Sequence, residues 1–216
     1  SGEISTYNDL LKIVPWIKHV GYNTVQLMGV LEHACYESYG YLTTNYFAVS
    51  SRFGSPSDFK CLVDEFHKND ICVLLDITHS HAADDDYPGM SHYNYFIKNK
   101  KSRWGTLFFD YKRYEVSHYL LCNLRWWMEE YKIDGFRFDA VNEVIYTECV
   151  FEKFSDYFDK TVFDSQIYFM MANELIHSYN PDNISVAEDY FGMPLLCSKQ
   201  DVGGLGFDYR QQTGIA

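Results

Sequence analysis

Several features that mark common classes of protein are missing from this chain of 216 residues. None of its six cysteines is paired at the C-x-x-C spacing of a zinc ribbon or a redox site. No apolar run approaches the roughly 18 residues of a membrane-spanning helix, and no secretory leader is visible. Lys and Arg are outnumbered 18 to 30 by Asp and Glu, and the formal net charge of −12 argues against nucleic acid or an anionic membrane as partner. Scattered thiols in a chain of this size predict an intracellular, cytoplasmic protein.

Aromatic residues, by contrast, are abundant at 18% of the sequence, with 19 tyrosines and 16 phenylalanines. Such rings suit a surface that stacks on sugars, and they equally suit an aromatic core. The acidic net charge is compatible with a neutral, polyhydroxylated substrate. The length fits a single domain with a sizeable core.

Segments with strand character and segments with helix character alternate along the chain. Apolar runs predict strands at residues 24–28, 71–77, 134–139 and 184–188. Amphipathic patterns predict helices at residues 8–20 with a kink or restart at Pro15, from Ser55 onward, at 115–131 and at 164–179. Regular alternation of this kind is typical of parallel strands joined by right-handed crossovers.

Two α/β architectures satisfy that alternation, an open doubly wound sheet and a TIM (β/α)8 barrel. The chain has neither a G-x-G-x-x-G after its first strand nor a phosphate-binding loop, which favours the barrel. We expect residues 1–216 to form one partial barrel domain with about half of the strands, and residues 84–105 to form a small inserted lobe after the second strand. Residues 32–47 are predicted to be an irregular loop, and the Gly-rich tail after Asp189 contains no convincing strand.

The stretch Asp134-Gly-Phe-Arg-Phe-Asp-Ala-Val141 carries the strongest chemical pattern. Side chains alternate along a strand, so Phe136 and Phe138 should share a buried face while Arg137 and Asp139 share the other. A guanidinium beside Asp139 favours the ionised carboxylate and lowers its pKa, as a nucleophile or electrostatic stabiliser requires. A purely structural ion pair explains these eight residues about equally well.

Polar side chains of catalytic type follow each predicted strand at the same end. Asp76, His79 and His81 follow the second strand, Arg137 and Asp139 the third, and Glu188 the fourth. In a barrel these ends meet on one face, so Asp139 and Glu188 should lie close together, and a pair at about 5–5.5 Å is the geometry of a retaining glycosidase.

Blander interpretations of the same residues stay open at this point. The His79-Ser-His81 pair has the residue types of a metal site, but no third ligand has matching spacing, and either histidine could simply cap a strand. Asp76 could have a purely structural role, as a hydrogen-bonding group in the barrel interior. Glu188 with Asp189 could be a solvated strand end.

Several blocks of this sequence resemble conserved regions of a known family. Asp76-Ile-Thr-His-Ser-His81, Gly135-Phe-Arg-Phe-Asp139 and Ala187-Glu-Asp189 are similar to three short regions of the α-amylase superfamily, glycoside hydrolase family 13. A finer resemblance to the eukaryotic glycogen and starch branching enzymes rests on blocks that run nearly end to end. These include Ser38-Tyr-Gly-Tyr41, Ser50-Ser-Arg-Phe-Gly-Ser-Pro56, His79-Ser-His-Ala82, Arg125-Trp-Trp127, Gly192-Met-Pro194 and Gly206-Phe-Asp-Tyr-Arg210.

The resemblance implies a glycosyltransferase of glycogen biosynthesis, a 1,4-alpha-glucan branching enzyme. Asp139 would be the nucleophile that attacks an α-1,4-glucan, and Glu188 the proton donor and then the base that activates a 6-hydroxyl to make an α-1,6 branch. Arg137 would orient Asp139, His81 would hydrogen-bond the sugar, Tyr41 would stack on it, and Asp76 would support the site. The family implies no metal and no cofactor, and its partner is the polysaccharide.

The sequence departs from the family pattern in one respect that matters for catalysis. A later strand should supply a His-Asp pair that grips the sugar hydroxyls, and no His in this chain is followed by Asp. Four of the eight strands of a barrel are predicted, so we expect an internal fragment that is inactive and marginally soluble alone. Two alternatives remain: an α-amylase-type hydrolase, in which water resolves the intermediate, and a truncated, non-catalytic glucan-binding protein.

Overall fold

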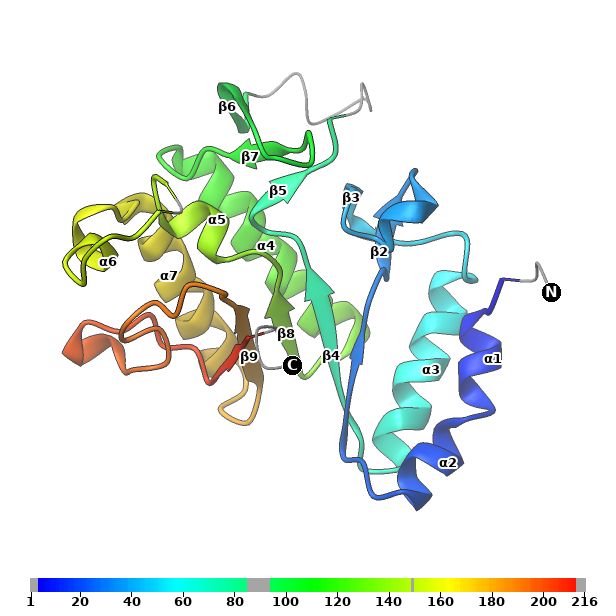
Figure 1. The fold of residues 1–216 in the computed structure, drawn as a ribbon. Coiled ribbons are helices and arrows are strands. Elements are labelled where there is room, and N and C mark those ends of the chain that lie inside the picture. Colours follow the sequence, from blue (N-terminus) through cyan, green and yellow to red (C-terminus); the bar gives the residue numbers. More distant parts are fainter. Residues whose placement is uncertain (1–3, 85–93, 149, 213–216) are drawn as a thin grey trace.

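Parallel strands joined by helices form the main sheet, as the alternation predicted. The computed structural model describes residues 4–84, 94–148 and 150–212. Five strands pair in parallel in the order β1-β4-β8-β9-β10, which makes an open half of a barrel (Figure 1). Their bounds are β1 Thr24–Leu27, β4 Cys72–Ile77, β8 Gly135–Phe138, β9 Ile184–Glu188 and β10 Tyr209–Gln211.

Three long helices cover this sheet and pack on one another in sequence order. They are α3 (Pro56–Lys68), α4 (Tyr114–Tyr131) and α7 (Phe163–Tyr179), with α3 against α4 and α4 against α7. The start of α3 is the expected capping box, because the Asp58 N–H donates to Ser55 Oγ and the Ser55 N–H donates back to Asp58 Oδ2.

The predicted restart near Pro15 is also present. The segment 8–20 divides into α1 (Tyr7–Leu11) and α2 (Val14–His19), and proline stands in the first turn of α2, where a missing N–H costs nothing. The helix α1 packs against α3, so this N-terminal segment belongs to the layer that covers the sheet.

The two faces of β8 separate as its sequence predicts. Phe136 and Phe138 are fully buried, and the Phe138 ring meets Phe169 of α7 at 5.7 Å and Phe207 at 5.6 Å between centroids. Edge-to-face contacts of this kind stabilise an aromatic core beyond simple burial. Gly135 is needed for a different reason: a Cβ there would lie 2.0 Å from the Ile184 carbonyl oxygen of β9.

The prediction of an irregular loop over residues 32–47 is wrong. The strands β2 (Leu31–His33) and β3 (Thr43–Val49) pair in antiparallel fashion, and the 3₁₀ helix η1 (Tyr36–Ser38) lies between them. The register shifts twice within this pair, which breaks the simple alternation of apolar and polar residues that predicts a strand. Tyr46 of β3 is buried and donates its hydroxyl to the His81 carbonyl at 2.6 Å, so this hairpin is tied to the start of the strand that follows β4.

The tail after Asp189 contains a strand that the sequence analysis missed. β10 pairs in parallel with β9, with Tyr209 opposite Val186 and Gln211 opposite Glu188. Two of its three residues are exposed and glycines precede it, so no apolar run marks it. The main sheet therefore has five strands instead of the four predicted.

A second, smaller antiparallel sheet follows β4 in the order β5-β7-β6. It comprises β5 (His81–Ala82), β6 (Phe96–Lys101) and β7 (Leu107–Phe109), and residues 85–93 of the predicted lobe lie outside the described residues. The lobe as a unit of residues 84–105 therefore stays a prediction. Short helices α5 (Asn142–Ile145), α6 (Asp156–Asp159) and η3 (Gln200–Val202) complete the described chain, in which no helix has the length and apolarity to cross a membrane.

Candidate active site

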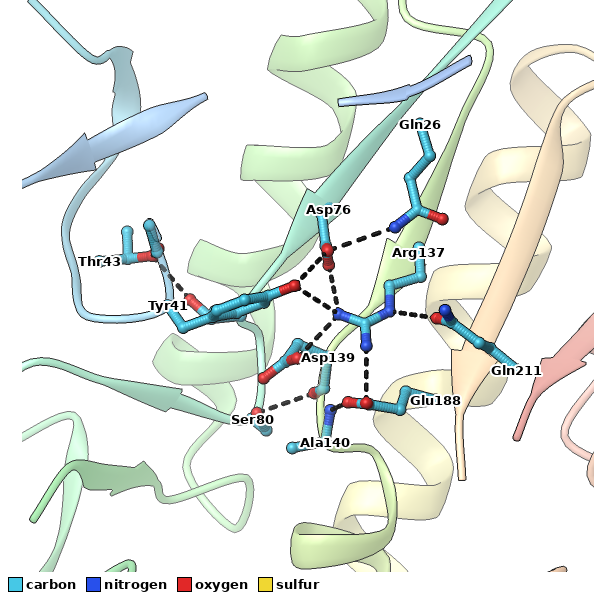
Figure 2. A network of polar contacts seen from close by, with 12 residues as sticks. Gln26, Tyr41, Thr43, Asp76, Ser80, Arg137, Asp139, Ala140, Glu188 and Gln211 are labelled. Atoms are coloured by element: carbon cyan, nitrogen blue, oxygen red, sulfur yellow. Dashed lines mark hydrogen bonds and ion pairs between the residues drawn. The ribbon is translucent and has the colours of Figure 1, made fainter. Parts of the chain in front are cut away.

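Three carboxylates and one guanidinium meet at the carboxyl end of the main sheet. Arg137 of β8 stands opposite Asp76 of β4 in the strand register. Asp139 follows β8 directly, and Glu188 is the last residue of β9, the other neighbour of β8. Adjacent parallel strands therefore bring the predicted residues together, as Figure 2 shows.

The side chain of Arg137, only 4% exposed, is the centre of this network. Its Nη1 lies 2.6 Å from Asp76 Oδ1 and 2.8 Å from Asp139 Oδ1, and its Nη2 lies 2.7 Å from Glu188 Oε1. One guanidinium thus contacts all three carboxylates, and its planar fork fixes their directions relative to one another.

Asp76 joins this centre to the cavity wall. Besides Arg137, it accepts the Tyr41 hydroxyl at 2.8 Å and the Gln26 side-chain amide at 3.3 Å on Oδ2. Burial raises the pKa of Asp76, while the charge of Arg137 offsets part of that rise. The contacts of Asp76 are all internal to the protein, which suits the supporting role expected of it.

The two histidines of the His79-Ser-His81 segment take different directions. His81 Nε2 lies 3.0 Å from the Tyr41 carbonyl and its Nδ1 2.8 Å from Ser80 Oγ, beside the cavity. His79 is fully buried in the core, between the Tyr168 hydroxyl at 2.6 Å and Asn123 Oδ1 at 2.9 Å. The histidines do not share a ligand position. Within the described ranges, no three His, Cys, Asp or Glu side chains are grouped to hold a metal ion.

Glu188 is held by groups on both sides of it. Its Oε2 accepts the Ala140 N–H at 2.8 Å, and its Oε1 accepts the Tyr190 hydroxyl. Ala140 has a φ of 49°, a left-handed conformation that a non-glycine residue adopts only where its surroundings enforce it. Glu188 and Asp189 are 5% and 0% exposed, so the interpretation of this pair as a solvated strand end is wrong.

Burial and neighbouring charges set the ionisation of Asp139 and Glu188. Burial raises the pKa of Asp139 to about 8; Arg137 acts against this rise, but Glu188 and Asp76 add to it. Burial also raises the pKa of Glu188, yet hydrogen bonds from Tyr190 and Ala140, with the charge of Arg137, outweigh burial and leave that pKa lowered. Each of the two carboxyl groups affects the ionisation of the other, so they titrate as a pair.

This order of pKa values corrects the expectation that Arg137 leaves Asp139 with a low pKa. The guanidinium does favour the ionised form, but it is divided among three carboxylates. Its single charge is shared among three carboxyl groups in a buried site, so burial and the two neighbouring carboxylates keep the pKa of Asp139 raised.

A cavity of about 440 Å³ opens over this cluster, within the size range of small-ligand sites. Its lining contains Tyr41, His81, Arg137, Asp139 and Glu188, together with Ser38, Leu42, Trp104, Thr106, Ala140 and Tyr190. Five of the six predicted site residues therefore line one cavity, and the sixth, Asp76, supports it from the interior.

Gln211 is a site residue that sequence reasoning missed. Its Oε1 accepts the Arg137 Nε–H at 2.7 Å, and it stands opposite Glu188 in the register of β9 and β10. No motif marked this residue, because its position depends on a three-residue strand that had not been predicted. Tyr190 was missed as well, although its place two residues after Glu188 was a usable signal.

Comparisons with known proteins show which family this chain resembles. The family described as "Alpha amylase, catalytic domain" matches residues 6–109. The 1,4-alpha-glucan-branching enzyme of Aspergillus oryzae is 44% identical over 99% of this chain and 33% of its own length. The enzyme of the same name from Felis catus is 42% identical over 99% of the chain and 33% of its own length. The chloroplastic/amyloplastic enzyme of Oryza sativa subsp. japonica is also 42% identical, over 99% of the chain and 28% of its own length.

Two solved structures share the fold at lower sequence identity. An α-amylase from Geobacillus thermoleovorans, complexed with acarbose, has a TM-score of 0.74 at 20% identity and covers 95% of this chain and 44% of its own. An Anoxybacillus α-amylase has a TM-score of 0.77 at 21% identity, with 96% of this chain and 44% of its own covered. These likenesses support the partial barrel.

The match of residues 6–109 to the α-amylase catalytic domain and the 42–44% identity to these relatives over nearly the whole chain place it with the α-amylase superfamily, and the two solved structures agree with its half-barrel fold. Within the superfamily, its sequence relatives are the eukaryotic 1,4-alpha-glucan-branching enzymes, which confirms the resemblance inferred from the motifs. The chain spans about a third of the length of the curated relatives it matches.

Proposed function

We propose that this chain carries the nucleophile and the proton donor of a 1,4-alpha-glucan-branching enzyme. The observation that carries the proposal is the contact of Asp139 and Glu188, on neighbouring strand ends, with the same Arg137 guanidinium. Two carboxyl groups at close range under one cavity suit retaining chemistry on a glycosidic bond. The relatives named above supply the substrate class, an α-1,4-glucan.

The proposed reaction has two steps that use the same pair. In the first, an Asp139 oxygen attacks the anomeric carbon while Glu188 protonates the departing 4-oxygen, and a covalent glycosyl-enzyme forms. In the second, Glu188 removes the proton from a 6-hydroxyl of an acceptor chain. That oxygen then attacks the same carbon, Asp139 departs as a carboxylate, and an α-1,6 branch results.

The cycle needs one proton on the pair, and the raised pKa of Asp139 with the lowered pKa of Glu188 favours that proton on Asp139. Catalysis requires the proton on Glu188 at the moment of attack. We therefore propose that substrate binding moves the proton from Asp139 to Glu188, because a glycosidic oxygen beside Glu188 accepts a hydrogen bond only from the protonated acid.

The other predicted residues have supporting roles in this proposal. Arg137 orients Asp139, and Asp76 holds both Arg137 and the Tyr41 hydroxyl. Tyr41 and His81 line the cavity, where they contact the sugar by stacking and by hydrogen bonding. The missing His-Asp pair belongs to the part of a complete active site that this sequence does not contain.

A hydrolase increases the number of reducing ends and a transferase does not, which makes the proposal testable. The full-length protein that carries this sequence is incubated with amylose, and iodine absorbance and reducing ends are followed together. Transfer lowers the absorbance while the number of reducing ends stays constant, whereas hydrolysis creates one reducing end for each bond broken. A parallel rise in reducing ends would favour the α-amylase-type hydrolase. Binding of maltoheptaose without either change would favour the non-catalytic glucan-binding protein.

A further inference from the structure

One large aromatic side chain of the cavity lining comes from outside the main sheet. Trp104 lies in the turn between β6 and β7, lines the cavity, and is 53% exposed. Its ring centroid is 6.4 Å from that of His81, with 31° between the planes. An exposed indole beside a site is unfavourable in water and is more common where a ligand covers it.

The turn that carries Trp104 is fixed by its own hydrogen bonds. Ser102 Oγ accepts the N–H of Trp104 at 3.1 Å and that of Thr106 at 3.2 Å. The Ser102 N–H donates to the Thr106 carbonyl at 2.9 Å, and Gly105 takes a φ of 79° to close the turn. The backbone under the indole is therefore held in one conformation.

A second set of contacts ties the indole to the catalytic loop. The Arg103 guanidinium lies 4.2 Å from the Trp104 ring centroid, a cation–π contact. Arg103 Nη2 also lies 3.2 Å from Glu143 Oε1, and the Glu143 side chain is only 13% exposed. Glu143 belongs to α5, which begins three residues after Asp139. The contacts of Arg103 therefore fix the position of the indole ring relative to the segment that follows Asp139.

We infer that Trp104 is a stacking platform for a glucosyl unit adjoining the one bonded at Asp139, an inference that rests on the proposed function. The C–H face of a pyranose ring packs on an indole in the way that other apolar groups do. Arg103 and Glu143 are positioning residues that hold the ring. The platform determines how tightly a chain binds beyond the reacting unit.

The test compares a chain substrate with a substrate of one unit in the full-length protein. Trp104→Ala should raise KM for amylose by roughly three- to tenfold with little change in kcat. Release of fluoride from α-glucosyl fluoride, which has no adjoining unit, should keep its kcat/KM. Trp104→Phe should retain most of the affinity, and Trp16→Ala, a tryptophan 61% exposed on α2, should change neither substrate.

The outcomes separate this inference from the proposed function. An unchanged KM for amylose in Trp104→Ala overturns the platform, and so does an equal loss of kcat/KM with both substrates. Neither result bears on the proposed branching activity of the wild-type protein. If the wild-type protein binds maltoheptaose without turnover, the same variants are compared by calorimetric titration, and the same fold-change in Kd is expected. A wild-type protein that neither transfers nor binds glucan overturns both proposals.

Discussion

Replacing Asp139 by Asn tests the ionisation of the carboxylate cluster directly. The amide keeps the size of the carboxyl group, and its oxygen still accepts from Arg137 Nη1, which is 2.8 Å from Asp139 Oδ1. What the substitution removes is a titrating group in a buried position. We expect Asp139→Asn to abolish glucan transfer and to make the stability of the folded domain less sensitive to pH.

The sign of the stability effect follows from the pKa of Asp139 in the two states. That pKa is about 8 in the folded protein and lies near 4 in an unfolded chain. Between these values the folded state favours a proton on Asp139 that the unfolded state has lost, so the contribution of Asp139 to wild-type stability falls as the pH rises. The stability difference between Asp139→Asn and wild type should grow by about 1.4 kcal/mol per pH unit, and by at most about 6 kcal/mol in total.

Other groups of the site also change the free energy of unfolding with pH. Burial lowers the pKa values of His79 and His81 to about 4, so both destabilise the protein as the pH falls from about 6.5. The lowered pKa of Glu188 acts in the same acidic direction. The histidine contributions are shared by wild type and variant. The pKa of Glu188 depends in part on Asp139, but a carboxyl group with a lowered pKa stays ionised at pH 5 and above, so the difference between the two proteins in that range reports Asp139.

Urea unfolding at pH 5, 6, 7 and 8, followed by tryptophan fluorescence, measures this difference. Asp201→Asn makes the same chemical change on an exposed residue of η3 and serves as the control. A constant difference in stability between Asp139→Asn and wild type from pH 5 to 8 would refute the reasoning. Asp139 would then be ionised in the folded protein, as the strand sequence alone suggests.

Three further predictions follow from the same geometry. Glu188→Gln should lower the transfer rate by about 10²–10⁴-fold, and added azide should restore turnover as glycosyl azide, detected by mass spectrometry; no azide product would argue against Glu188 as the acid/base. Gln211→Leu removes the acceptor of Arg137 Nε, which is 2.7 Å from Gln211 Oε1, and should cost about 1–3 kcal/mol in urea unfolding and lower kcat more than it raises KM. An unaffected kcat would show that Arg137 does not need this contact. The pKa of buried His79 is lowered to about 4, so protonation of this side chain in the unfolded chain should take roughly 3 kcal/mol from the free energy of unfolding as the pH falls from about 6.5 to 4, which is measured as the difference between wild type and His79→Gln. His79→Gln should flatten that loss of stability, and a slope equal to that of wild type would contradict it.

The sequence predicted the parts of the fold that repeat a simple pattern. β4 is an apolar run buried on both faces, β8 alternates two phenylalanines with Arg137, and α3 begins with a capping box, so all three elements can be recognised in the sequence. β10 cannot be recognised in the sequence, because its three residues become a strand by pairing with β9 and their side chains show no strand pattern. β2 and β3 were missed because their irregular register hides the alternation.

The candidate site shows the same division between local and long-range information. Asp76, Arg137, Asp139 and Glu188 were predicted because they lie at the carboxyl ends of three strands, β4, β8 and β9. The pKa order of Asp139 and Glu188 was not, because it depends on Tyr190 and on the Ala140 N–H, which meet Glu188 only in the folded chain. Arg137 and Asp139 on one strand were enough to suggest an ion pair. They could not show that Arg137 contacts three carboxylates in the folded chain.

The small sheet β5-β7-β6 and the main sheet carry different residues of the cavity. His81 belongs to β5 and pairs with Phe108 of β7, and the turn after β6 carries Trp104, so both cavity residues are attached to one hairpin unit. Asp139 and Glu188 are attached to the main sheet instead. A change in the length or tilt of the hairpin would move His81 and Trp104 together and leave Asp139 and Glu188 in place. Under the proposed function, exchange of this hairpin between relatives would alter chain-length preference without a change in Asp139 and Glu188.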